Sequence, residues 1–313
     1  MDCSISITLD GLFDLYKCDA VLRPATVHHF SFVVGLFSRT VGAIPFTEIT
    51  RDMILTFRDQ VLARAQPSTW NNYLRHLRTI GSFAVRMEYA KDNPFMQIKP
   101  APVSHKRKKT IDDKLLRQAF TVLDDTGGSG NKDPLQPKWF WNIVMKVLYS
   151  TGIRRRQLVE IRWRHVDLEQ GTLLLVAEGS KTRREWWIPL MPEVIADLKY
   201  LHKRTLELQA PDDITNMQVF NVTLFYDRYS GDAMTEEQLS GFFRRLSSVL
   251  GQRITPHRFR HTLATKLLQG THPDIKTVQK LLGHTDMRMT LEYVEIGLDD
   301  LRALLHARLG DFL

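Results

Sequence analysis

Four side chains near the end of this 313-residue sequence have types and spacing that suit phosphate chemistry. His257 and Arg260 lie three positions apart. His284 follows a Leu-Leu-Gly run, and Tyr293 comes nine residues later. A phenol is a poor nucleophile unless another group takes its proton or stabilises its anion, whereas an arginine fork binds two phosphate oxygens at once. Because an imidazole can accept or donate a proton, the set suits metal-free attack of a tyrosine on a phosphodiester.

The surrounding residues predict three short helices that deliver these side chains. Thr255 followed by proline is typical of a helix start, so His257 and Arg260 are expected on one face of that helix. Apolar residues recur at helical spacing over 275–282, and Gly283 can end this second helix in a left-handed conformation. The second histidine then emerges from a turn, and a further short helix carries the tyrosine.

An earlier basic motif, T-G-I-R-R-R-Q-L, places Arg154 at the start of another predicted helix. The preceding apolar helix, 139–149, is expected to be buried and to end at Gly152. Free backbone N–H groups and the helix dipole already favour an anion at such a start, so three consecutive arginines oppose the dipole. A bound phosphate gives a reason for that arrangement.

Residues 166–190 have the clearest strand character. Turns at Gln170-Gly171 and Gly179-Ser180 predict a three-stranded antiparallel meander. Lys181 falls in the second predicted turn, where an exposed lysine is common, so spacing alone gives it no role.

Residues 8–94 are predicted to form an all-helical domain of about 90 residues, with helix starts near Thr8, Pro24, Thr50 and Pro67. The last of these helices has an apolar face that includes Tyr73. Its polar side chains either contact DNA or form a solvated face: Asn71, Arg75, His76 and Arg78.

Residues 99–109 are predicted to be a linker, because their two prolines disfavour both helix and strand. The linker ends in an uninterrupted basic run: Lys106, Arg107, Lys108 and Lys109. Such a run is either a disordered, solubilising segment or a strap along a phosphate backbone. Its place between a helical domain and the motif-bearing domain favours the strap.

Composition favours a globular protein with a polyanionic partner. The net charge is +8 and the sequence pI is about 9.5. Cys3 and Cys18 are too few for a disulfide framework, which favours a reducing compartment. No apolar run approaches the roughly 18 residues that span a bilayer, and the N-terminus lacks a signal-peptide pattern. We therefore expect a cytoplasmic protein with no membrane partner.

Together these motifs resemble the tyrosine recombinases of the phage-integrase type, over residues 8–310. The resemblance is carried by H-R-F-R-H-T-L-A-T, L-L-G-H, the tyrosine after it, and T-G-I-R-R-R-Q-L. The last motif departs from the family pattern at Gln157, where the family usually has glutamate. The resemblance implies a mainly α fold with a small antiparallel β-sheet (α+β), made of a helical core-DNA-binding domain (1–98) and a catalytic domain (110–313).

The resemblance also implies a site-specific DNA recombinase that cuts and rejoins DNA to integrate, excise or resolve DNA elements. Tyr293 would attack a backbone phosphate, forming a 3′-phosphotyrosyl link and freeing a 5′ hydroxyl. Arg154 and Arg260 would hold the non-bridging oxygens. No metal ion, nucleotide or other cofactor is implied, because the ester conserves the bond energy.

Three further residues receive roles by the same resemblance. His284 would donate to the reacting phosphate, and His257 would assist proton transfer at the phenol. The S-K-T turn matches the phage-integrase form, so Lys181 would protonate the departing 5′ oxygen.

The implied partners are double-stranded DNA recombination sites and three further copies of the chain, as a homotetramer. The tail after Tyr293 is amphipathic and either folds back on its own domain or docks as a helix on a neighbouring protomer. Its apolar positions are Leu298, Leu301, Leu304, Leu305 and Leu309. The target sequence and any accessory proteins are not specified by these patterns.

Two alternative functions use similar residues. A type IB topoisomerase uses such a set as a monomer, but the short helical N-terminal domain and the leucine-rich tail argue against it. A DNA-binding protein that has lost catalysis is disfavoured because every catalytic position is filled.

A zinc helix at His257 and His261 is disfavoured because Arg258 stands where H-E-x-x-H has glutamate, and nearby arginines repel a metal.

Overall fold

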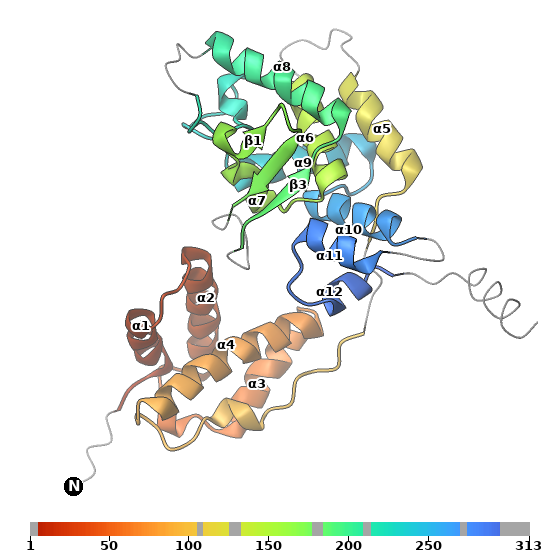
Figure 1. Ribbon diagram of the computed structural model, residues 1–313. Coiled ribbons are helices and arrows are strands. Elements are labelled where there is room, and N and C mark those ends of the chain that lie inside the picture. The colour runs from red at the N-terminus through yellow and green to blue at the C-terminus, as the bar shows by residue number, and fades with distance from the viewer. Residues whose placement is uncertain are drawn as a thin grey trace, which may run out of the picture. The chain divides into compact units, whose positions relative to one another are not determined.

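The computed structural model describes residues 6–104, 109–124, 133–176, 184–208, 214–269 and 274–294. The chain divides into two compact units, Met1–Lys106 and Arg107–Leu313 (Figure 1). The division falls inside the predicted linker. The predicted fold class, mainly helical with a small antiparallel sheet, is confirmed. None of the described helices is long and apolar enough to cross a bilayer.

Unit 1 is built from helices that begin where the sequence predicts. They are α1 (Leu9–Asp19), α2 (Pro24–Val41), α3 (Arg51–Leu62) and α4 (Pro67–Arg86), with 3-10 turns η1 (Phe46–Glu48) and η2 (Pro94–Gln97). The Thr8 hydroxyl accepts a hydrogen bond from the Gly11 N–H at 3.2 Å and so caps α1. The Thr50 hydroxyl caps α3 in the same way, from the Met53 N–H at 3.4 Å.

An aromatic cluster forms the core of unit 1. The ring of Phe37 lies 5.2 Å from Phe57 and 5.5 Å from Phe95, between centroids. Helix α4 supplies fully buried Trp70 to the same core. Tyr73, expected on the buried face of α4, is only half-buried. The buried face is therefore centred closer to Trp70 than the pattern of apolar residues indicates.

Unit 2 surrounds a small sheet with helices. The helices are α5 (Asp113–Asp124), α6 (Lys138–Thr151), α7 (Arg155–Glu160), α8 (Pro192–Leu208), α9 (Glu236–Leu250), α10 (Pro256–Leu267), α11 (Ile275–Leu282) and α12 (Arg288–Leu291), with 3-10 turns η3 (Trp163–His165) and η4 (Val222–Leu224). The strands are β1 (Val166–Asp167), β2 (Thr172–Leu175) and β3 (Trp186–Pro189).

The sheet has the order β1-β2-β3 and is antiparallel throughout, as the meander prediction requires. Leu173 of β2 pairs with Ile188 of β3, and both side chains are buried. Gly171 lies in the first turn with φ of +63°, a conformation that favours glycine. The second predicted turn, with Lys181, lies outside the described residues.

Helix α6 is the centre of unit 2. It packs against α5, α8 and α10, and its Trp141 ring stacks on Phe242 of α9 at 4.1 Å between centroids. Phe140 and Trp141 are fully buried, as the apolar run predicts. This packing fixes the C-terminal end of α6, from which the first arginine of the site follows.

Candidate active site

The turn after α6 places Arg154. Gly152 ends the helix in a left-handed conformation (φ +61°), and a Cβ there would lie 3.0 Å from the side chains of Leu263 and Leu282. Arg154 then becomes the N-cap residue of α7. The Gln157 side-chain oxygen accepts a hydrogen bond from the Arg154 backbone N–H at 2.9 Å. The glutamine therefore still anchors this arginine, although the family pattern has glutamate at its position.

The Arg154 guanidinium has an unsatisfied donor. Its Nη1 is buried and has no hydrogen-bond partner among the described residues. Burial lowers the pKa of Arg154, and the neighbouring Tyr293 raises it. Because an unpaired buried donor is costly, this N–H group is suited to donate to an anionic oxygen of a ligand.

Arg260 of α10 is oriented by backbone carbonyls from two distant segments. Its Nη1 donates to Gly152 O at 2.8 Å and its Nη2 donates to Leu282 O at 2.7 Å. The residue is only 3% exposed. Burial and, to a smaller extent, the charge of Arg154 lower the pKa of Arg260 to about 10, with Tyr293 opposing the shift. The group therefore stays charged at neutral pH with its planar fork held in place.

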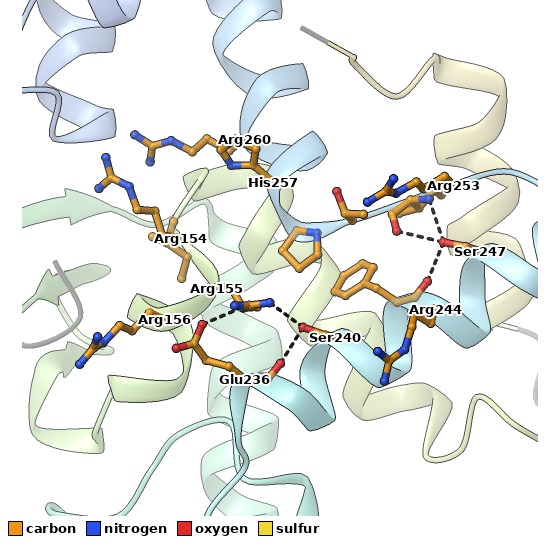
Figure 2. A pocket seen from close by; sticks show the side chains of 15 residues that line it. Arg154, Arg155, Arg156, Glu236, Ser240, Arg244, Ser247, Arg253, His257 and Arg260 are labelled. Carbon is orange, nitrogen blue, oxygen red and sulfur yellow. Dashed lines mark hydrogen bonds and ion pairs between the residues drawn. The ribbon is translucent and has the colours of Figure 1, made fainter. Parts of the chain in front are cut away.

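Arg154, His257 and Arg260 line one pocket of about 850 Å³. Figure 2 shows the Arg154 and Arg260 side chains extending in the same direction from their helices. Four more arginines line the pocket: Arg155, Arg156, Arg244 and Arg253. Arg155 is neutralised by Glu236 at 2.7 Å, but within the described ranges the other three make no ion pair. The pocket is therefore strongly cationic.

Tyr293, just after α12, reaches the same group of residues and is 4% exposed. Its hydroxyl forms a hydrogen bond with Nδ1 of His261 at 3.0 Å. Its ring stacks on His284, with 6.0 Å between centroids and 10° between planes. His261 follows Arg260 on α10, and Arg260 bonds Gly152 O two residues before Arg154, so the phenol and both guanidiniums belong to one cluster.

The turn that presents His284 is supported from the sheet. Gly283 ends α11 with φ of +61°, as predicted, and the Trp186 ring of β3 would lie 2.3 Å from a Cβ placed there. The Trp186 Nε1–H also donates to Leu281 O at 3.2 Å. His284 in turn has its Nδ1 2.8 Å from Thr290 Oγ1. Close approach of the indole therefore requires the glycine.

The structure brings together five of the six residues that the sequence singled out: Arg154, His257, Arg260, His284 and Tyr293. The sixth, Lys181, lies outside the described residues. Sequence reasoning missed the contact between His261 and Tyr293, because His261 was considered only as a zinc ligand. Within the part of the chain that the structure describes, no group of three or more metal-ligating side chains occurs.

The polar side chains of α4 have partners in unit 1. Asn71 Nδ2 donates to Ala101 O at 2.9 Å, and the Ala101 N–H donates to Asn71 Oδ1 at 2.7 Å. Arg78 donates to the carbonyls of Phe95 and Ile98. These bonds tie η2 and the segment after it to the helix. Whether the two side chains also contact DNA stays a prediction.

The other two predicted contacts on α4 differ from each other in exposure. His76 is 9% exposed, its Nδ1 lies 2.7 Å from Asn72 O, and burial lowers the pKa of its imidazole. Arg75 is exposed and donates to Asn72 Oδ1. In the basic run, Lys109 is exposed. Residues 106–108 lie outside the described residues.

Comparison with known proteins finds a matching family, similar sequences and a similar fold. The sequence pattern of the phage integrase family matches residues 130–297. A Pseudomonas aeruginosa protein, "Putative tyrosine recombinase XerC", is 32% identical over 268 residues, or 83% of this chain and 62% of the relative. A protein of the same name from Pseudomonas syringae is 30% identical over 312 residues, covering 96% of this chain and 64% of the relative.

The chain thus spans less than two thirds of the length of these relatives. The fold is also that of the Tn1549 transposon integrase solved with transposon right end DNA, at a TM-score of 0.77 and 16% identity. That likeness covers 96% of this chain and 99% of the integrase chain. The family match extends over the whole segment that carries the arginines, histidines and tyrosine of the site, and the chain therefore belongs to the phage integrase family.

Proposed function

We propose that the chain is a site-specific DNA recombinase that cuts and rejoins DNA through a 3′-phosphotyrosyl intermediate. The observation that carries the proposal is that the Tyr293 hydroxyl is bonded to His261 of α10, next to Arg260, and that Arg260 is bonded to the carbonyl two residues before Arg154. Two guanidiniums beside a buried phenol can bind the non-bridging oxygens of a phosphate, and a phosphate bound there would lie within reach of the phenol. No residue of the cluster requires a metal ion for this chemistry.

In the proposed reaction Tyr293 attacks the phosphorus of a backbone phosphodiester. Arg154 and Arg260 bind the non-bridging oxygens as negative charge increases, and the unsatisfied Nη1 of Arg154 supplies one donor. The resemblance implies that His257 assists proton transfer at the phenol; from its place in the pocket wall it is also suited to donate to a phosphate oxygen. His284, beside the phenol ring, donates to the same phosphate. Lys181 protonates the departing 5′ oxygen. Reversal of the same steps with another 5′ hydroxyl rejoins the strand.

The remaining arginines of the pocket support a polymeric phosphate substrate. Arg156, Arg244 and Arg253 line the pocket beyond the two reacting guanidiniums. Phosphates recur along a DNA backbone, so neighbouring phosphates of the same strand can occupy these positions. We expect non-specific affinity for duplex DNA to fall steeply with salt concentration, with the basic linker 99–109 contributing to the slope.

The proposal extends to assembly and location. We propose that protomers act as a homotetramer on two double-stranded recombination sites, with the C-terminal tail docking on a neighbouring protomer. The tail lies outside the described residues. The support for its docking is therefore its amphipathic sequence pattern alone. We also propose that the protein acts in the cytoplasm. Cross-linking on a two-site DNA would measure the number of protomers.

A suicide substrate tests the proposed chemistry. A nicked duplex that loses a short oligonucleotide after cleavage traps the covalent product, which a denaturing gel displays. We expect a protein–DNA adduct with the wild type and none with Tyr293→Phe, which keeps the ring and removes the nucleophile. An adduct that persists in the phenylalanine variant would refute the proposal. Strand exchange between two sites, as opposed to relaxation of supercoils alone, separates a recombinase from a topoisomerase.

A further inference from the structure

We propose that His261 is the group that accepts the proton of Tyr293 during strand cleavage. This inference rests on the proposed function and names a residue that the sequence motifs leave without a role in the reaction. Tyr293 Oη and His261 Nδ1 are 3.0 Å apart, and both side chains are buried, at 4% and 7% exposure. This is the hydrogen-bond distance that a general base needs.

The charges around the pair favour transfer in this direction. Four titratable or charged side chains surround the His261–Tyr293 pair. They are His257 and Arg260 from α10, Arg154 from the start of α7, and His284 from the turn after α11. Arg154 and Arg260 carry fixed positive charges, so they attract the negative charge that develops on the phenol and phosphate oxygens as the proton leaves. With its Nδ1 at the phenol oxygen, His261 is placed to take that proton.

His257 has a different position from His261. Its ring lies 4.1 Å from the His261 ring, in an edge-on arrangement, and it lines the cationic pocket. A donor on the pocket side is suited to a phosphate oxygen. His261 has its Nδ1 at the phenol oxygen itself. The two histidines thus have different roles. His257 donates to the phosphate, and His261 accepts the proton of the nucleophile.

The proton balance of the step is as follows. His261 begins as the tautomer with a proton on Nε2 and a lone pair on Nδ1. The Tyr293 O–H bond breaks, an N–H bond forms at Nδ1, and the phenol oxygen forms a bond to phosphorus. The bond from phosphorus to the 5′ oxygen breaks, and that oxygen takes a proton from Lys181, the acid in the proposed function. Rejoining returns both protons.

The pH dependence of single-turnover cleavage tests this assignment. The proteins to compare are the full-length wild type, His261→Asn, His261→Gln and the matched control His257→Asn, each on the suicide substrate between pH 5 and 9.5. Asparagine replaces Nδ1 with an oxygen that accepts a hydrogen bond but takes no proton. We expect the His261 variants to cleave about 10²–10⁴-fold more slowly at pH 7. Their rates should rise towards high pH, as the phenolate forms without a base.

The control variant decides between the two histidines. In the wild type we expect cleavage to fall below about pH 6.5, as a histidine base becomes protonated. His257→Asn should lower the rate but keep this acidic limb. If His257→Asn loses the limb, or if a His261 variant keeps the wild-type profile, the assignment is wrong. If neither His261 variant folds, loss of the acidic limb in His257→Asn still refutes the assignment, and its retention excludes His257 as the base.

A Tyr293→Phe reaction separates this inference from the proposed function. An adduct that survives in Tyr293→Phe overturns the function itself. A tyrosine-dependent adduct with an unchanged pH profile in His261→Asn overturns only the role of His261. A merely structural role of His261 predicts a rate deficit that is the same at every pH, which also counts against the proposal.

Discussion

Helices α4 and α10 carry the same kinds of side chain and use them differently. Both begin with proline, and both carry histidines and arginines. On α4, Arg78 donates to two carbonyls of the segment that follows the helix, as Arg260 of α10 donates to the carbonyls of Gly152 and Leu282. The carbonyls that hold Arg260, however, belong to segments that also bring a second arginine and Tyr293.

The difference shows that residue type alone does not identify a reaction site. A histidine or arginine bonded to the backbone of its own unit stabilises that unit, as His76 and Arg78 do. A site needs several such groups, delivered from separate segments, around one atom that can react. In unit 2 that atom is the phenol oxygen, and in the described part of unit 1 no such convergence is found.

Replacing Arg260 of α10 and Arg78 of α4 by lysine should show most clearly that the two helices have different roles. Arg260→Lys keeps the charge but loses the planar fork, so we expect single-turnover cleavage to fall about 10²–10³-fold. The matched variant Arg78→Lys should lower the stability of unit 1 and leave cleavage at saturating protein nearly unchanged. The measurements are adduct formation and urea unfolding for both proteins. Equal losses of cleavage in both would remove the distinction between the helices.

Alanine variants of two helix-ending glycines in unit 2 would show how much the contact with Trp186 stabilises the turn that carries His284. Gly283 and Gly251 both have a left-handed conformation, but only Gly283 is covered by the Trp186 ring, since nothing lies within 4 Å of a Cβ at Gly251. Gly251→Ala should cost about 1 kcal/mol of unfolding free energy from backbone strain alone. Gly283→Ala should cost about 1–3 kcal/mol more, because the indole has to move.

Urea unfolding of both glycine variants checks these values. Gly283→Ala should also slow cleavage, since the displaced turn carries His284, whereas Gly251→Ala should cleave like the wild type. A Gly283→Ala protein as stable as Gly251→Ala would show that the indole contact contributes nothing to the turn.

Local signals could be predicted from the sequence, and contacts across the fold could not. Threonine and proline at helix starts, and glycine at helix ends, act through the nearest backbone groups. Thr8 therefore caps α1 and Gly283 ends α11, as predicted. The hydrogen bond between His261 and Tyr293 joins residues 32 positions apart, and that between Trp186 and Leu281 joins residues 95 apart. Neither spacing follows from helical or strand periodicity.

The same reason accounts for the polar face of α4. The sequence left open whether these side chains contact DNA or solvent, and Asn71 in fact bonds the backbone 30 residues later. That partner belongs to the linker predicted at 99–109, and a linker gives no pattern from which a specific hydrogen bond could be expected.

Asn71 and Arg75 separate a stabilising role on α4 from a DNA-binding one. Asn71→Ala removes two hydrogen bonds, so we expect the unfolding free energy of unit 1 to fall by about 1–3 kcal/mol. Arg75→Ala, at an exposed position, should change it by less than about 0.5 kcal/mol. If Arg75 contacts a phosphate, its loss should reduce the slope of log affinity against log salt by about 1. An unchanged slope would remove Arg75 from the DNA interface.

The smallest expected effect is the pH dependence of unit 1 that comes from His76. Burial lowers the pKa of its imidazole, with the charges of Arg75 and His29 acting in the same direction and the Asn72 carbonyl opposing them. The unfolded chain therefore binds a proton more readily than the folded unit does. Stability should be fully present above the unfolded pKa of about 6.5 and should decrease as pH falls through the lower folded value. Thermal unfolding at pH 5 and pH 7.5 measures this loss, and His76→Gln should reduce the difference between the two. On α10, by contrast, a titrating histidine should alter the cleavage rate, so an effect of His76→Gln on the acidic limb of cleavage would contradict the separation of the two helices.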